Sequence, residues 1–99
     1  MKILAIEKEC LGSHAESMQA RLKPEAMRVW ELYQKGIVRE AYFQAESHEA
    51  VLILECDDLI EAQTVIRTLP LVEEGLIDFT LIPLIPYDGF ARLFTSRST

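Results

Sequence analysis

The stretch "TLPLVEEGLIDFTLIPL", residues 68–84, joins the end of a helical pattern to a strongly apolar strand pattern. Pro70 lacks an amide proton and disfavours helix at the residue before it, so we expect the helix to stop at Leu69. Two acids then lead to Gly75, which is free to adopt a positive φ in a turn. The strand expected over residues 76–85 has few polar positions to present to water. This stretch therefore predicts a strand that is covered on both faces.

Two helical patterns precede this strand. The later one follows Asp58, which has capping-box spacing to the acid three residues on, and it ends at Leu69. The earlier one starts at Pro24, which suits the first turn of a helix, and ends before Gly36. The apolar positions are Ala26, Val29, Trp30 and Tyr33 in the earlier pattern, and Leu59, Ala62, Val65, Ile66 and Leu69 in the later one.

Three further segments have strand character. Residues 3–8 give a first strand, and residues 37–44 and 50–56 flank a polar turn as a hairpin. The resulting order is βαββαβ, which predicts the α+β class and the ferredoxin-like fold. That fold has a four-stranded antiparallel sheet with two helices on one face. Pro83 and Pro86 remove donors late in the last strand, which favours an edge position for it.

The strands carry apolar side chains on both faces, because successive side chains of a strand point to opposite sides. Six side chains on the face without helices would contribute on the order of 10 kcal/mol if buried, which is comparable to the net stability of a domain. We therefore expect a homodimer in which two sheets face each other as a barrel. A monomer whose tail covers the second face is the alternative. The opposed sets are Ile3 and Ala5 against Leu4 and Ile6, Val51 and Ile53 against Leu52 and Leu54, and Phe79 and Leu81 against Ile82 and Leu84.

The length, charge and cysteine content of the chain limit the kinds of protein that it can be. The chain is expected to form a single domain over residues 1–99, with a tail at about 86–99. Its 10 basic and 16 acidic residues give a formal charge of −6, which argues against binding a phosphate backbone. No apolar run approaches the roughly 20 residues of a membrane span, and the apolar start is too short for a signal peptide, so a cytoplasmic location is expected. Cys10 and Cys56 lack metal-ligand spacing and are expected as thiols, with a disulfide left open.

Three segments resemble a known group of small proteins. They are "KGIVREAYF" (35–43), "LPLVEEGLIDFTLIPL" (69–84) and "PYDGFARLF" (86–94). Together they are similar to the muconolactone isomerase-like and YCII-related proteins, above all in Leu-Pro-Leu at 69–71 and in Gly36-x-x-Arg39. The resemblance implies a dimeric α+β barrel of the ferredoxin-like fold.

The resemblance also implies a function: a cofactor-independent isomerase or lyase acting on a small acidic organic molecule. Moving a proton beside a carbonyl needs a base, a proton donor and a dry pocket. The alternative is a non-catalytic small-ligand-binding or interaction module of the same barrel fold. The segment Lys-Pro-Glu-Ala at 23–26 lacks the His that YCII-related proteins carry there, which favours the alternative for the chemistry of that branch.

Four residues are the candidates for the site. Glu7 is either a buried base at the end of the first strand or a strand-end acid paired with a cation. His14, in the long loop, is either an acid–base group on a lid or a solvated side chain. Arg39 either binds a substrate carboxylate or forms an ion pair. Tyr42 either donates a hydrogen bond in a pocket or only packs. Glu7 and His14 would be catalytic, and Arg39 and Tyr42 would bind substrate.

The remaining polar and aromatic residues are expected to play smaller parts. His48 is expected on the surface of the hairpin turn, and Trp30 is expected to pack in the core. Glu40 and Glu55 are further acidic candidates. Cys10 and His14 lack a third ligand, so no metal site and no cofactor are expected.

Overall fold

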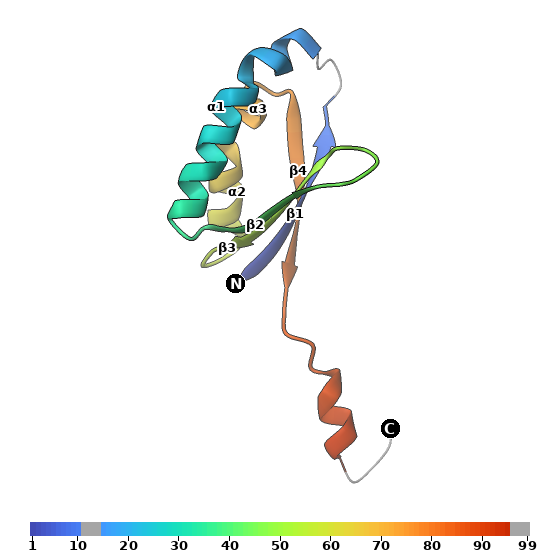
Figure 1. Cartoon of the computed structure of the whole chain (residues 1–99). Coiled ribbons are helices and arrows are strands. Elements are labelled where there is room, and N and C mark those ends of the chain that lie inside the picture. The colour runs from blue at the N-terminus through green and yellow to red at the C-terminus, as the bar shows by residue number, and fades with distance from the viewer. Residues whose placement is uncertain (11–14, 96–99) are drawn as a thin grey trace.

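The structure is a computed structural model that describes residues 1–10 and 15–95. Its elements follow the order βαββαβ, with one short helix added before the last strand and one 3-10 helix after it (Figure 1). They are β1 (Lys2–Glu9), α1 (Ala15–Gln34), β2 (Val38–Phe43), β3 (Ala50–Glu55), α2 (Leu59–Arg67), α3 (Pro70–Glu73), β4 (Ile77–Leu84) and η1 (Gly89–Phe94).

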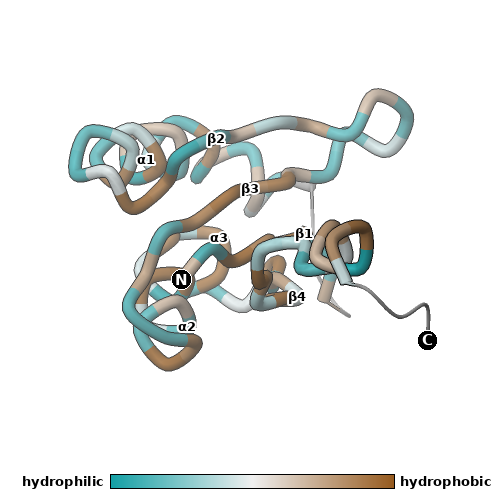
Figure 2. Tube along the Cα trace, turned by 90° about the horizontal axis from the view of Figure 1, so that it is seen from below, coloured by the Kyte–Doolittle hydropathy of each residue, from teal (hydrophilic) through white to brown (hydrophobic). Residues whose placement is uncertain are grey.

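The four strands form one antiparallel sheet in the order β2-β3-β1-β4, so the ferredoxin-like fold is confirmed. β2 and β3 form the predicted hairpin, and β4 is an edge strand, as its prolines indicated. A register shift between Val38 and Glu40 interrupts the pairing of β2. The helices lie on one side of the strands, and apolar residues run along β3 in the centre (Figure 2).

The helix break at Leu69 is confirmed. Thr68 caps α2, and Leu69 is extended with φ −73° and ψ 128°. Pro70 then begins α3, a single turn that the sequence did not predict, because proline is also preorganised for the first position of a helix. Leu71 anchors this turn in the core with 5% exposure, and Gly75 follows with φ +74°, as expected.

The first helix differs from the prediction at its start and along its apolar stripe. α1 begins at Ala15, so Pro24 lies inside it rather than in its first turn. Proline lacks the amide proton for one backbone bond, and the helix changes direction along its length (Figure 1). Trp30 and Tyr33, expected in the core, are 54% and 52% exposed. Among residues 16–34, the buried side chain is instead that of Leu32, which is 1% exposed.

The core lies between the sheet and the helices and contains no buried polar or charged residue among those described. On the other side of the sheet, six apolar side chains face away from the helices. Four of them are half-buried, and Ile82 and Leu84 are 38% and 37% exposed. We call this set the open face: Leu4, Ile6, Val51, Ile53, Ile82 and Leu84.

The chain leaves β4 as a tail, residues 85–95, that runs away from the sheet and helices (Figure 1). The molecule therefore measures 61 × 28 × 22 Å. The tail does not lie over the open face, so it does not provide the cover that a monomer would need. Within the described residues, no helix is long and apolar enough to cross a membrane.

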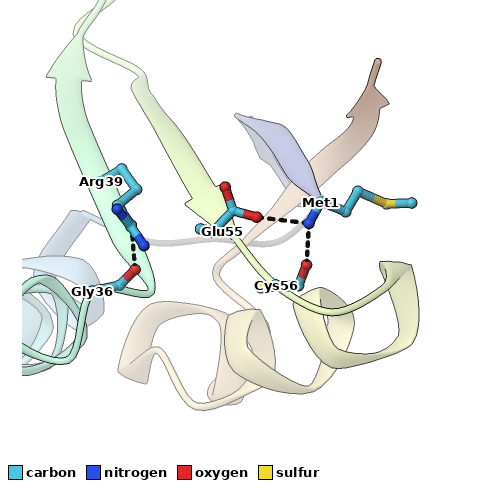
Figure 3. Close-up of polar contacts among 5 residues, drawn as sticks. All are labelled: Met1, Gly36, Arg39, Glu55 and Cys56. Carbon is cyan, nitrogen blue, oxygen red and sulfur yellow. Dashed lines mark hydrogen bonds and ion pairs between the residues drawn. The ribbon is translucent and has the colours of Figure 1, made fainter. Parts of the chain in front are cut away.

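The start of β1 is fixed by polar contacts. The Met1 ammonium group donates to Glu55 Oε2 at 2.6 Å and to the Cys56 carbonyl at 2.7 Å (Figure 3). The other cysteine follows the far end of β1, where the Cys10 amide donates to the Leu76 carbonyl. Both cysteines are free thiols, because opposite ends of a strand of this length are too far apart for a disulfide within the chain.

Candidate functional site

A cavity of about 740 Å³ lies between α1 and the sheet. Its walls are mostly apolar and come from α1, all four strands and Leu71 of α3. Titratable residues line it from different elements: Glu7 of β1, Glu25 and Tyr33 of α1, and His48 of the β2–β3 hairpin. Its outer rim, which we call the mouth, consists of the half-exposed aromatic residues Trp30, Tyr33 and Phe43.

Glu7 lies on the helix-covered face of β1, which it shares with Ile3 and Ala5, and lines the cavity. Burial raises the pKa of its carboxyl, while a hydrogen bond from the Ala50 amide to Oε1, 2.9 Å long, acts in the opposite direction. The ion pairs found among the described residues do not include Glu7. Among the described residues, Glu7 thus accepts a backbone hydrogen bond in the cavity and forms no ion pair.

Glu25 is a second cavity acid, which the sequence reasoning missed. Its Oε1 accepts a hydrogen bond of 2.9 Å from the Leu71 amide at the start of α3. Burial raises the pKa of its carboxyl, and the negative charge of Glu7 raises it further. The available signal was its place in the helical stripe, since Glu25 lies four residues before Val29 and three after Leu22. An acid inside an apolar stripe is a candidate for a buried functional group.

The hairpin brings His48 to the same cavity. Tyr42 pairs with Val51 of the open face, so its side chain points to that face and not into the cavity. His48 adopts a positive φ of 59°, and its ring stacks on Phe43 with 4.0 Å between centroids. It was expected on the surface, and it is exposed, but it also lines the cavity. The Tyr42 hydroxyl donates a hydrogen bond of 2.5 Å to Glu40 Oε1, and this bond raises the pKa of the hydroxyl.

The other candidates lie elsewhere. Arg39 does not line the cavity: its Nε donates to the Gly36 carbonyl at 2.6 Å (Figure 3). Glu55 is bonded to the Met1 ammonium group, which lowers the pKa of its carboxyl. His14 lies outside the described residues. Trp30 belongs to the mouth rather than to the core, because it is more than half exposed and lines the cavity.

The arrangement suits proton transfer better than metal binding. Among residues 1–10 and 15–95, no cluster of three His, Cys, Asp or Glu side chains could hold a metal ion. The cavity residues in these ranges also include no Lys or Arg. Two carboxyls with raised pKa values line one apolar cavity, and a carboxyl accepts a proton when it is ionised and donates one when it is protonated.

The raised pKa values of Glu7 and Glu25 make stability depend on pH. The pKa of each carboxyl in the folded state lies above its ordinary value of 4.5. The free energy of unfolding therefore falls as the pH rises from 4.5 through the folded-state pKa. The double variant E7Q/E25Q keeps both acceptor oxygens and removes the charges. We expect it to be more stable than the parent at pH 7 by about 1 kcal/mol or less, since both side chains are partly solvated. The gain should vanish at about pH 3.5, where the parent carboxyls are protonated.

Urea unfolding at both pH values measures this difference. The control is E46Q/E73Q, which removes two charges from exposed glutamates of the hairpin and α3. An equal gain for E7Q/E25Q at both pH values would show that burial of the carboxyls is not its cause.

The sheet order and the one-sided helices define a small α+β protein of the ferredoxin-like fold, with a cavity between its first helix and its sheet. No protein-family model matches the chain, and no curated protein matches it in sequence. Among solved structures, it is similar to 5-chloro-2-hydroxyhydroquinone dehydrochlorinase (TftG) from Burkholderia phenoliruptrix AC1100, in complex with 2,5-dihydroxybenzoquinone. The match has a TM-score of 0.61 at 19% identity and covers 86% of this chain and 94% of that one. At this identity the likeness shows the fold alone.

Proposed function

We propose that the protein is a muconolactone isomerase-like, cofactor-independent isomerase or lyase of the cytoplasm. The observation that carries this proposal is the pair Glu7 and Glu25, two carboxyls with raised pKa values in one apolar cavity. The sequence resemblance to the muconolactone isomerase-like and YCII-related proteins supports it. So does the fold, which is similar to that of a dehydrochlorinase.

In the proposed reaction, ionised Glu7 accepts a proton from a carbon next to a carbonyl. The resulting enolate is protonated at a second position by Glu25, and the double bond moves between the two positions. If the second position carries a leaving group, that group departs with the Glu25 proton, and the reaction is an elimination. Protons and electrons balance in both cases, and the two carboxyls exchange roles.

The cavity restricts the ligand. A substrate carboxylate beside Glu7 and Glu25 would find no cation among the described cavity residues, and Arg39 lies outside the cavity. The acidic molecule expected from the sequence is therefore better represented by a compound whose acidic group is a phenol or an enol. The ring bound to TftG, 2,5-dihydroxybenzoquinone, belongs to this class, and we propose such hydroxylated rings and lactones as the first compounds to test.

The experiment combines binding and proton exchange. Quenching of Trp30 fluorescence reports binding, because Trp30 is the single tryptophan and lies at the mouth. For each compound that binds, NMR in D₂O measures exchange of its carbon-bound protons and any product. In E7Q we expect exchange to slow about 10²–10⁴-fold, with binding changed far less. The matched control is E9Q, two residues on in β1, where the side chain is exposed and does not line the cavity.

A second candidate function is a non-catalytic module that binds a small ligand in the same cavity. The absence of the YCII-type His at residues 23–26 favours it. Binding without proton exchange or product formation across the panel would establish this module and remove the enzyme proposal.

We also propose that the protein is a homodimer whose two open faces pack together. The support is the set of six apolar side chains on the open face, which neither the helices nor the tail covers. Solvent-exposed antiparallel sheets normally alternate apolar and polar side chains, and this face has apolar residues on three adjacent strands.

A further inference from the structure

The aromatic residues of this chain lie almost entirely on its surface. Of one Trp, three Tyr and four Phe, Phe79 is buried and the others are more than half exposed. Three of the exposed aromatic residues form the mouth, and Tyr42 lies on the other side of β2. The remaining three, Tyr87, Phe90 and Phe94, lie in the tail. Exposed aromatic side chains gathered in this way mark surfaces that bind a partner. The chain therefore carries two such surfaces, the mouth and the tail.

The tail has an ordered shape of its own. Tyr87 and Phe90 pack edge to face with 4.8 Å between ring centroids, and the Ala91 amide donates to the Asp88 carbonyl. Gly89 lies under the Tyr87 ring, where an added Cβ would come within 2.2 Å of ring atoms. This local packing leaves Phe90, Leu93 and Phe94 exposed by 64%, 74% and 85%. The tail is thus folded locally while its largest apolar side chains remain free to make contacts.

The tail of the same chain leaves the sheet at the edge opposite the mouth. It continues from β4, which is one edge strand of the order β2-β3-β1-β4. The mouth lies along α1 and β2, and β2 is the other edge strand. From Leu84 the tail runs away from the domain (Figure 1).

We infer that the tail of a second copy closes the mouth of the cavity, an inference that rests on the proposed homodimer. Ile82 and Leu84 of the open face lead directly into the tail, so a copy packed on this face brings the tail next to its partner. The partner's own open face is then occupied by the apposed sheet. The mouth of the partner remains an uncovered aromatic surface, and the exposed side chains of the tail are aromatic as well.

Charge complements this arrangement. The tail carries Arg92, which is exposed. The hairpin segment beside the mouth, residues 40–49, contains Glu40, Glu46 and Glu49 and no Lys or Arg. Closure would therefore bring Arg92 next to an acidic rim, although Asp88 balances its charge within residues 85–95. Closure would also exclude water from Glu7 and Glu25, as proton transfer in a cavity requires.

Trp30 tests this inference without any ligand or reaction. In the parent dimer, closure should shield Trp30 from acrylamide, although it is 54% exposed in a single chain. In the full-length variant F90S/F94S, we expect the quenching constant to rise roughly two- to threefold and the emission to shift to the red. The control I60S removes a side chain that is 72% exposed on α2 and should leave quenching unchanged.

A mixed dimer distinguishes the two tails. One copy carries W30F and has an intact tail. The other copy keeps Trp30 and carries F90S/F94S. The two copies carry different tags, are refolded together, and the heterodimer is isolated. Shielding of Trp30 as in the parent would show that the partner's tail closes the mouth. Unshielded Trp30 in this heterodimer, or equal quenching of the parent and F90S/F94S, would overturn the inference. A monomeric parent would overturn it too, and it would leave the acid–base proposal to the proton-exchange assay.

Discussion

The double variant L4K/I53K is expected to be a monomer, because it disrupts the interface of the proposed dimer. Leu4 and Ile53 are paired neighbours at the centre of the open face. Replacing both removes about 3–6 kcal/mol of apolar burial and puts two ammonium groups into the interface. The dissociation constant should rise about a thousandfold or more. Size-exclusion chromatography with light scattering at micromolar concentration measures the change.

The matched control is I60K/Q63K, which adds the same charge to exposed positions of α2. It should remain dimeric, and circular dichroism should show that both variants keep their secondary structure. A monomeric parent, or an L4K/I53K variant that stays dimeric, would remove the open face as the dimer interface.

The variant L32A is expected to lower the free energy of unfolding by about 2–5 kcal/mol, the range for leucine truncation in a core. Leu32 is 1% exposed and is the buried side chain of residues 16–34. Its loss removes the main apolar anchor of α1, which forms one wall of the cavity. The net stability of a domain is about 5–15 kcal/mol, so this effect is large.

Urea unfolding, followed by circular dichroism, measures the cost of L32A. The control M27A truncates a side chain of the same helix that is 56% exposed, and it should change stability by about 0.5 kcal/mol or less. If both variants cost the same, Leu32 is not the anchor of α1. The two results together therefore test how the cavity wall is held in place.

Most of the fold could be predicted from local sequence signals. Pro70 ends one helix and Gly75 allows the turn into β4, and both act through the backbone of their own segment. The prediction failed where one signal has two physical readings. Pro24 suits the first turn of a helix, yet α1 begins nine residues before it. In this part of α1, Arg21 forms an ion pair with Glu74 and Glu25 accepts a hydrogen bond from Leu71. Both partners follow α2 in the chain.

The site was predicted only in part, because it depends on distances between segments. The position of Glu7 follows from strand alternation, which is local. Glu25 reaches the cavity through contact with Leu71, a residue 46 positions away, which no periodicity reveals. Periodicity likewise identifies the stripe that contains Trp30 but not what lies opposite that stripe. Arg39 could not be placed, since a long side chain can turn back to a nearby carbonyl, as it does to that of Gly36.

The way α1 is attached has a consequence for how the molecule opens. Strands β1 and β3 and helix α2 share a continuous core. Helix α1 adds Leu32, the partly buried Met18 and Val29, the hydrogen bonds from Arg28 to Thr68 and from Leu71 to Glu25, and the ion pair of Arg21 with Glu74. Breaking these contacts costs less than global unfolding, so we expect α1 to open as a separate cooperative unit. Its amide protons should exchange with solvent before those of β1 and β3. The cavity can therefore admit and release a molecule by local opening of one helix while the sheet stays folded.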